Sequence, residues 1–315
     1  MKSVQQTTLR SPVTLVGTGV HSGDEVQVIL HPAEAGHGIA FLRTGLQGRG
    51  DRLIDARYLA VSATELCTVI GERESGAVAT IEHLMSALYG LGVDNVLVEV
   101  SGVEVPILDG SAAPIVEAID QVGIVNCGSS RRYLKVLKNV RVAQGKAFAE
   151  LRPIDRGFRI DVEIDFPNPL IGRQRRATDV SATSYRRDIA RARTFGFMRD
   201  VERLWKAGFA LGASLDNTVA IGEDSIINPE GLRFADEFVR HKMLDAIGDL
   251  ALAGWPLIGA YRSYCGGHRL NVAVLEALFS DRSNYTIIEG AGRRETGYAE
   301  LGSGIAVPAY APDVH

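Results

Sequence analysis

The sequence predicts an α+β protein built from two domains. Strand-like segments follow one another in runs and helices come after them, a pattern typical of α+β folds and not of alternating parallel folds. With 315 residues, the chain has room for two domains of about 150 residues, and each half can bury its own core. Apolar residues make up 46% and charges nearly balance, which argues against disorder.

The first half reads as strands, a helix, a strand and a second helix. Alternating apolar and polar residues predict paired strands over 13–23 and 25–33. Helical periodicity follows over 79–90, with Thr80 as the expected N-cap, because four apolar residues form one stripe: Ile81, Leu84, Met85 and Leu88. Residues 94–100 are then predicted as a strand. A short helix over 114–123 begins with a proline.

The polar segment 126–132 is interpreted as a linker between domains 1–127 and 133–315. After it, strands are predicted over 133–143, 147–153 and 158–166. A mixed region spans about 181–228, and a long helix runs from about 234 to 253. The second half therefore repeats the order of the first, with strands before helices.

Composition excludes several classes of protein. A formal net charge of −4 gives no global reason to bind nucleic acid. Three scattered cysteines, Cys67, Cys127 and Cys265, form no disulfide framework and fit a reducing compartment. No signal-peptide core and no apolar run of about 18 residues is present. We therefore expect a cytoplasmic protein without stable membrane insertion.

The long helix carries the first chemical signal. His241, Asp245 and Asp249 recur every four residues along one stripe, with Lys242 one step aside. Side chains four apart on a helix converge, so His241 and Asp245 could supply two ligands to one metal ion. The alternative is an ordinary solvated face in which Lys242 and Asp245 form a surface pair. The helix alone leaves both interpretations open.

Three further segments could join this site. His83 follows Glu82 on the first helix, and a carboxylate beside a metal ligand suits general-base work. His268 follows two glycines that let the backbone approach a neighbouring group. The segment 190–200 fits neither period well and could present the Thr194 hydroxyl in a turn. The alternative for each lone histidine is an ordinary hydrogen-bonded residue.

Five long segments together resemble one enzyme family: 80–100, 104–114, 190–200, 231–250 and 266–271. The chain is similar to the UDP-3-O-(3-hydroxyacyl)-N-acetylglucosamine deacetylases, which are zinc-dependent hydrolases of lipid A biosynthesis. The resemblance runs in order from about Gln6 to Asn271. It implies removal of the N-acetyl group from acylated UDP-N-acetylglucosamine, with release of acetate.

The resemblance also implies the architecture and the metal. Two α+β domains of similar topology are expected, each layering helices against a sheet, with the active site between them. An insert at about 197–222 should form an apolar passage for the acyl chain. His83, His241 and Asp245 should bind one zinc ion per chain and leave one position open. Two histidines and a carboxylate also suit Fe(II), which stays an alternative.

Roles for other residues follow from the same resemblance. Glu82 is expected as general base, Thr194 as donor to the oxyanion, and His268 as acid. Asp249 should orient His268, and Lys242 should line the site. The residues expected to bind substrate are Phe166 at the uracil, with Asp165 beside it, and in or near the passage Phe195, Met198, Trp205 and Leu211.

One position departs from the family pattern. Cys265 stands where the family usually places a basic residue that contacts the pyrophosphate, so Arg262, Arg269 or Lys242 would have to supply that charge. His21 and Cys67 match family positions near the pocket and the metal. The resemblance suggests a monomer, and the sequence assigns no role to the tail after about residue 281.

Three other functions stay open from sequence. The chain could be another zinc amidohydrolase or sugar deacetylase, which would need neither the uracil contact nor the acyl passage. It could be a non-catalytic binder of acylated nucleotide sugars, although the retained Glu82 and His268 argue against that. A structural zinc site usually has four ligands, often cysteines, whereas this set has three and no cysteine.

Overall fold

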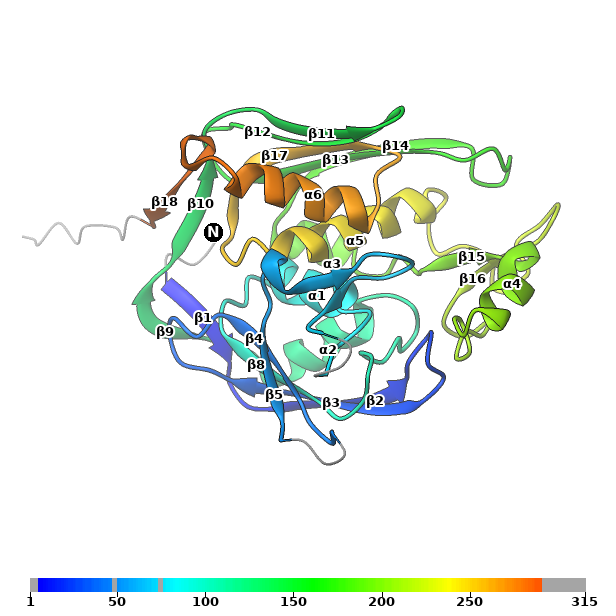
Figure 1. The fold of residues 1–315 in the computed structure, drawn as a ribbon, viewed down its shortest axis with the longest axis horizontal. Helices are drawn as coiled ribbons and strands as arrows, with labels where there is room; N and C mark the ends of the chain where they lie inside the picture. The colour runs from blue at the N-terminus through cyan, green and yellow to red at the C-terminus, as the bar shows by residue number, and fades with distance from the viewer. Residues whose placement is uncertain (1–4, 47–49, 73–75, 291–315) are drawn as a thin grey trace, which may run out of the picture.

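The computed structural model describes residues 5–46, 50–72 and 76–290. Two β-sheets form the outer layers, and the main helices lie between them (Figure 1). The predicted α+β class is confirmed. Because each sheet presents one face to the helices, the apolar residues of strands and helices meet in a continuous buried core.

The first sheet has five strands in the order β2-β3-β8-β4-β5. Their bounds are Val13–Thr18 for β2, Glu25–Pro32 for β3, Val96–Val100 for β8, Ile39–Arg43 for β4 and Arg52–Asp55 for β5. The antiparallel pairing of β2 with β3 matches the strand pair predicted from alternation. On β3, Val26, Val28 and Leu30 face inward and are buried, so period-two patterning sets which face meets the helices.

The second sheet has seven strands. They are β10 (Arg132–Val136), β11 (Val140–Gln144), β12 (Ala147–Arg152), β13 (Phe158–Asp165), β14 (Arg173–Asp179), β17 (Leu257–Tyr264) and β18 (Tyr285–Glu289). Strand β17 joins the sheet together, because it pairs with β12 antiparallel and with β13 and β10 in parallel. The tail is thus partly structured: β18 pairs with β10, whereas 291–315 lie outside the described residues.

The helices between the two sheets are α1 (Glu82–Leu91), α2 (Ala113–Val122), α3 (Ala182–Asp188), α5 (Glu237–Ala251) and α6 (His268–Phe279) (Figure 1). Helix α1 from the first half packs directly on α5 from the second half. The two helices approach very closely at Gly248, where an added Cβ would lie 1.9 Å from the main-chain oxygen of Glu82. Only glycine allows this approach, which brings the chemistry of the two helices together.

Short elements complete the chain. Strand β1 (Gln5–Leu9) pairs with β9 (Ile124–Ser130), and β6 (Val61–Ala63) pairs with β7 (Val69–Ile70) after the turn η1 (Tyr58–Ala60). A projection at one end of the molecule consists of β15 (Phe195–Phe197), η2 (Met198–Asp200), α4 (Val201–Lys206) and β16 (Val219–Ile221) (Figure 1). Turn η3 (Arg282–Asn284) precedes β18.

The segment 126–132 is more ordered than its composition indicates, and the Thr80 cap prediction is wrong. Most of the segment predicted as a linker, 126–132, is strand β9, and Arg131 is buried with its Nε 2.8 Å from Asp94 Oδ1. Backbone pairing with β1 outweighs the polar composition there. Thr80 does not cap α1, which begins at Glu82. It adopts a φ of 56° and donates its hydroxyl to Glu104 at 2.7 Å. The division into domains 1–127 and 133–315 stays a prediction.

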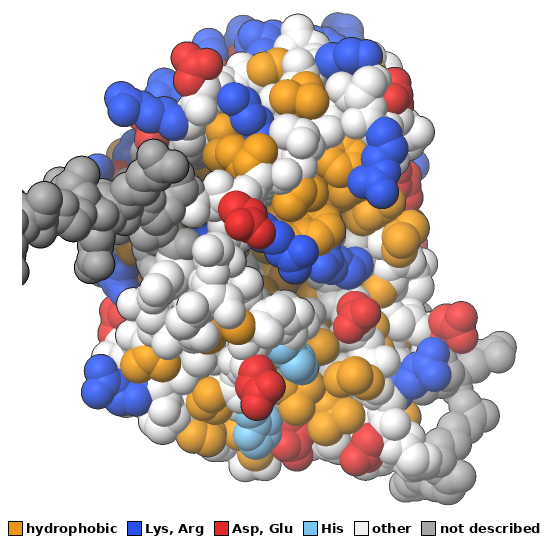
Figure 2. Space-filling model, turned by 90° about the vertical axis from the view of Figure 1, so that its left-hand side faces the viewer, with side chains coloured by type: hydrophobic (Ala, Val, Ile, Leu, Met, Phe, Trp, Pro, Cys, Tyr) orange, Lys and Arg blue, Asp and Glu red, His pale blue; other side chains and the backbone are white. Residues whose placement is uncertain are grey.

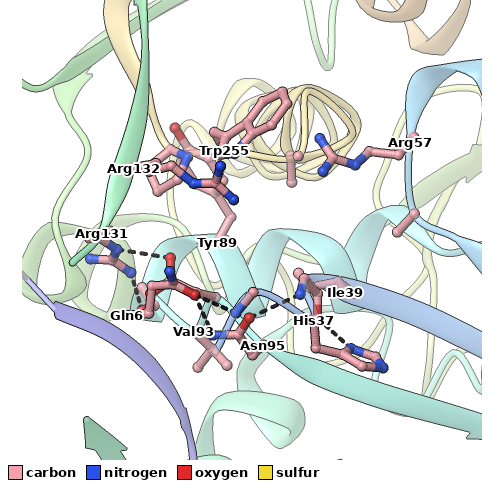
Figure 3. A pocket seen from close by; sticks show the side chains of 18 of the residues that line it. Gln6, His37, Ile39, Arg57, Tyr89, Val93, Asn95, Arg131, Arg132 and Trp255 are labelled. Atoms are coloured by element: carbon pink, nitrogen blue, oxygen red, sulfur yellow. Dashed lines mark hydrogen bonds and ion pairs between the residues drawn. The ribbon is translucent and has the colours of Figure 1, made fainter. Parts of the chain in front are cut away.

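A cavity of about 290 Å³ lies between the two halves, away from the projection (Figure 3). Arg57 from the first half donates to Ala253 O at 3.0 Å, and its guanidinium lies 4.3 Å from the ring centroid of Trp255. Arg131 binds Asp94 and Gly92 O. Figure 2 shows the end of the molecule that carries β1, β9, β10 and β18, where a few Lys and Arg side chains lie near the middle and others are spread over the upper part of the view. Through its contacts with Ala253 and Trp255, Arg57 links the first half of the chain to the second.

Among the described residues, no helix combines the length and the apolar character needed to span a bilayer.

Candidate metal centre

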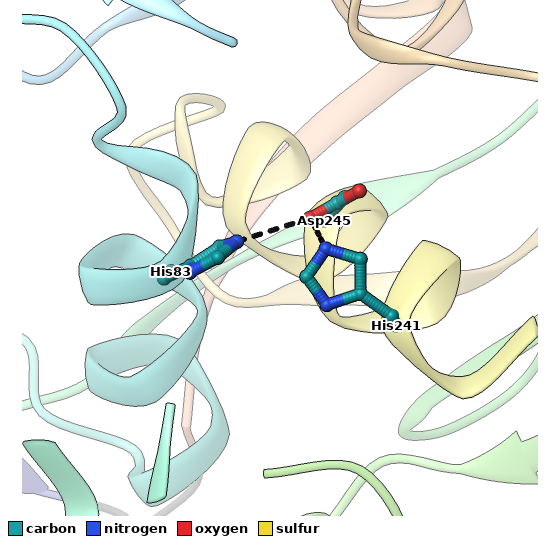
Figure 4. A group of neighbouring side chains, drawn as sticks. All are labelled: His83, His241 and Asp245. Carbon is teal, nitrogen blue, oxygen red and sulfur yellow. Dashed lines mark ion pairs between the residues drawn. The ribbon is translucent and has the colours of Figure 1, made fainter. Parts of the chain in front are cut away.

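Three side chains from two helices converge between the sheets (Figure 4). His83 comes from the first turn of α1, and His241 and Asp245 lie one turn apart on α5. Asp245 Oδ1 is 3.6 Å from His83 Nε2 and 3.3 Å from His241 Nε2. All three side chains are buried, and their ligand atoms lie within 4.8 Å of one another. The interpretation of this helix stripe as a solvated face is therefore wrong.

The donor set fits a metal ion. His241 Nδ1 lies 3.1 Å from the carbonyl oxygen of Ala192, which can only accept, so Nδ1 carries the proton and Nε2 presents a lone pair. Burial lowers the pKa of His241 to about 3, against the opposing effect of Asp245, so the ring is neutral. The lone pairs of Nε2 and Asp245 Oδ1 then face each other at 3.3 Å. A cation bound between the two atoms would satisfy both lone pairs. The hydrogen bond from His241 Nδ1 to Ala192 O holds the ring in the orientation that metal binding needs.

Glu82 lies beside this group at the first residue of α1, and its side chain is buried. Its Oε2 accepts the main-chain N–H of Thr68 at 3.0 Å, and its Oε1 lies 4.0 Å from His268 Nε2. Burial raises the pKa of Glu82, and the nearby His268 and His83 offset only part of that rise. A carboxylate with a raised pKa is suited to accept and release a proton.

His268 begins helix α6, and it is held by a network of buried groups. Its Nδ1 lies 2.9 Å from Asp249 Oδ2, which also accepts from Asn271 Nδ2 at 2.8 Å. Burial alone would lower the pKa of His268, but Asp249 and then Glu82 raise it to about 9. The imidazole is therefore charged at neutral pH, with Nδ1–H on Asp249 and Nε2 directed toward Glu82.

Lys242 and His21 flank the centre. Lys242 Nζ lies 2.8 Å from Asp245 Oδ2 and 5.4 Å from the ring centroid of Phe195. Burial lowers its pKa, but Asp245 outweighs that effect and raises it, so the ammonium stays charged. His21 lines a second cavity, which also borders Glu82 and His83. The main-chain N–H of His21 donates to Glu104 at 3.1 Å. Burial lowers the pKa of His21.

A mostly apolar cavity of about 350 Å³ opens from Glu82 and His83 into the projection. Thr194, Phe195, Met198 and Trp205 line it, and Met198 and Trp205 belong to the insert at about 197–222. Met198 and Trp205 are half exposed, so the rim of the cavity meets solvent. Leu211 lies outside the lining and is also half exposed.

Phe166 and Asp165 lie at the end of β13, near the projection. The ring centroid of Phe166 is 5.9 Å from that of Phe195, and Asp165 Oδ2 accepts from the Tyr264 hydroxyl at 2.9 Å. Neither residue lines the apolar cavity. Cys265 adopts a φ of 46°, and its Sγ lies 3.9 Å from Asp165 O. Cys67 is buried nearer the metal group, and burial, with Glu82, raises its pKa to about 12, so its thiol is protonated and unreactive.

The family model of UDP-3-O-acyl N-acetylglycosamine deacetylase, LpxC, matches residues 6–280. This chain belongs to the LpxC family. Relatives from Brucella ovis, Brucella canis and Brucella melitensis biotype 2, each named UDP-3-O-acyl-N-acetylglucosamine deacetylase, are 53% identical over 285 residues. These matches cover 90% of this chain and 98% of each relative. The resemblance stated from sequence is confirmed, and the chain is an N-deacetylase enzyme.

Sequence reasoning missed three residues that organise this LpxC site. Thr68 contacts both Glu82 and Asp249, Asn271 holds Asp249, and Glu104 binds the loop of His21 and the hydroxyl of Thr80. Thr68 follows Cys67, which was singled out, and Asn271 follows His268 within a matched segment. Neither has a periodic or charge signal of its own, because a buried hydroxyl or amide gains its role only from tertiary contacts.

Proposed function

We propose that this chain hydrolyses the N-acetyl group of UDP-3-O-acyl-N-acetylglucosamine and releases acetate, as a step of lipid A biosynthesis. The names of its 53% identical relatives support this substrate. One structural observation carries the proposal. Two imidazoles and a carboxylate converge beside a buried glutamate at the inner end of an apolar cavity. That arrangement supports amide hydrolysis beside a compartment suited to an acyl chain.

We assign His83, His241 and Asp245 as the ligands of one zinc ion, with Fe(II) as the alternative. A divalent ion bound there supplies Lewis acidity, which polarises the acetyl carbonyl and makes water a stronger nucleophile. Lys242 keeps a positive charge 2.8 Å from Asp245 and faces the same space. The predicted monomer and cytoplasmic location stay predictions.

The surrounding residues divide the proton transfers between them. Glu82 accepts a proton from the attacking water at its carboxylate, whose pKa burial raises toward the range of a general base. Thr194 lines the cavity beside Glu82 and His83 and donates its hydroxyl to the oxygen that becomes negative. His268 gives the leaving nitrogen a proton, since an amine leaves poorly as an anion. Asp249 holds the charged imidazole in place.

Residues of the projection and of the edge of the second sheet bind the substrate. The acyl chain enters the cavity lined by Phe195, Met198 and Trp205, where apolar walls favour it over water. Phe166, packed against Phe195, offers an aromatic face for the uracil, with Asp165 beside it. Leu211 contributes at most to the outer rim, because it is half exposed and outside the lining.

The direct test is deacetylation of UDP-3-O-(3-hydroxyacyl)-N-acetylglucosamine by the purified chain. We expect acetate release that a strong chelator abolishes and that zinc restores, because His83, His241 and Asp245 then regain their ion. UDP-N-acetylglucosamine without the acyl chain is the matched substrate control and should react much more slowly, since it leaves the cavity unfilled. Equal turnover of both substrates, or activity that survives chelation, would contradict the proposal.

The rate should fall at high pH when His268 loses its proton. Because the pKa of His268 is raised to about 9 from 6.5, the alkaline limb of kcat/KM should lie near pH 9. Asp249→Asn removes the carboxylate that does most to raise the pKa of His268. The alkaline limb of kcat/KM should therefore move to lower pH by about one to two pH units. A pH series for both proteins checks this, with the exposed Asp179→Asn as control. An unmoved limb in Asp249→Asn would exclude His268 as the acid.

A further inference from the structure

Among the residues that the structure describes, Thr68 is buried and its polar groups contact both the proposed base and the proposed acid of this site. It lies just before β7, and none of its surface is exposed. Its main-chain N–H donates to Glu82 Oε2 at 3.0 Å. Its hydroxyl lies 2.6 Å from Asp249 Oδ1 and 3.2 Å from His268 Nδ1. A residue from the first half therefore touches helices α1, α5 and α6 at one point.

The hydrogen-bonding capacity of the hydroxyl fixes its direction. Asp249 accepts only, so the hydroxyl of Thr68 must donate its single proton to Oδ1. The oxygen then turns a lone pair toward His268 Nδ1, which carries the proton shared with Asp249 Oδ2 at 2.9 Å. Asn271 fills the remaining position on Oδ2. Thr68 thus helps to keep the proton on Nδ1 and the carboxylate of Asp249 in one orientation.

We propose that Thr68 is a positioning residue for the deacetylation, holding Glu82 through its main chain and the Asp249–His268 pair through its hydroxyl. The inference rests on the proposed function, because it takes Glu82 as base and His268 as acid. The two contacts are chemically separable. A side-chain substitution removes the hydroxyl and leaves the main-chain N–H on Glu82.

Thr68→Val and Thr68→Ser separate the hydroxyl from packing. Valine has nearly the shape of threonine but cannot donate to Asp249, so kcat should fall about 10- to 100-fold with KM little changed. Serine keeps the hydroxyl and should retain most of kcat. Metal content should match the parent in both variants, since Thr68 contacts no ligand. The matched control is Thr8→Val, a buried threonine bonded to Asn95 O in the first half, which should keep parental kcat.

A double-mutant comparison shows whether Thr68 acts through Asp249. If it does, Thr68→Val should cost little more kcat in an Asp249→Asn background, because the group it positions has already changed. A merely structural contribution would multiply with the loss in Asp249→Asn. Multiplicative losses, a Ser variant as impaired as the Val variant, or a fully active Val variant would each overturn the inference.

A readout independent of turnover separates this inference from the proposed function. The Nδ1–H proton of His268, assigned by its loss in His268→Gln, reports the contact with Asp249 and Thr68 by NMR. Its resonance should shift or exchange faster in Thr68→Val and stay near the parental position in Thr68→Ser. An inactive parent with these shifts would reject only the proposed function. An active parent with an unchanged resonance in Thr68→Val would reject only the role of Thr68.

Discussion

Glu82→Gln should lower kcat by about 100- to 10,000-fold while metal content stays that of the parent. Glutamine has the same length and keeps an oxygen that can accept the main-chain N–H of Thr68, 3.0 Å away in the parent. It lacks a basic carboxylate, so the proton of the attacking water has no acceptor at this position. The loss should therefore appear in kcat, with the fold and the ligands preserved.

Acetate release under saturating substrate, paired with metal analysis of the same sample, measures this effect. Glu99→Gln is the matched control, because Glu99 lies on β8 and its carboxylate pairs with His31 at 2.8 Å, outside the metal group. Near-parental kcat in Glu82→Gln with metal bound would remove Glu82 from the role of base. Loss of metal together with activity would instead show that the variant disturbs His83.

His83→Ala should release the metal and abolish activity together. The change removes one of the three proposed ligands, and the other two come from α5. Loss of an outer-shell partner alone typically costs about 10- to 100-fold in metal affinity, so loss of a ligand should cost more. The alanine side chain has no lone pair to offer a metal ion, and it does not fill the space that the imidazole leaves.

Metal content after dialysis against a weak chelator, measured beside acetate release, tests the ligand set. His31→Ala serves as the control, since His31 is a partly exposed histidine of β3 outside the metal group. It should retain metal and turnover. An unchanged metal content in His83→Ala would mean that the ion is held elsewhere.

Sequence periodicity predicted the main elements because burial in this fold is strongly patterned. The apolar stripe of Ile81, Leu84, Met85 and Leu88 is completely buried, and the helix was predicted within a few residues of its bounds. The same reasoning did not indicate the strand in the polar segment 126–132. Strand β9 is held by backbone hydrogen bonds to β1, 115 or more residues earlier in the chain, and side-chain composition does not report such pairing.

The site was predicted through a combination of residue spacing and resemblance. His241 and Asp245 converge because they lie four apart on α5, which spacing alone indicates. The place of His83 depends on the close crossing of α1 and α5 at Gly248, and no local pattern encodes it. Thr68 was missed for a related reason. Its importance comes from contacts with Asp249 and His268, which lie far along the chain.

The crossing of α1 and α5 also orders events during synthesis of the chain. His83 leaves the ribosome before His241 and Asp245, so His83 and Glu82 lack their partners on α5 when they are first made. An ion held by the three proposed ligands would require that α5 has been made and has packed against α1 at Gly248. Metal binding by all three residues would therefore depend on the docking of the two halves.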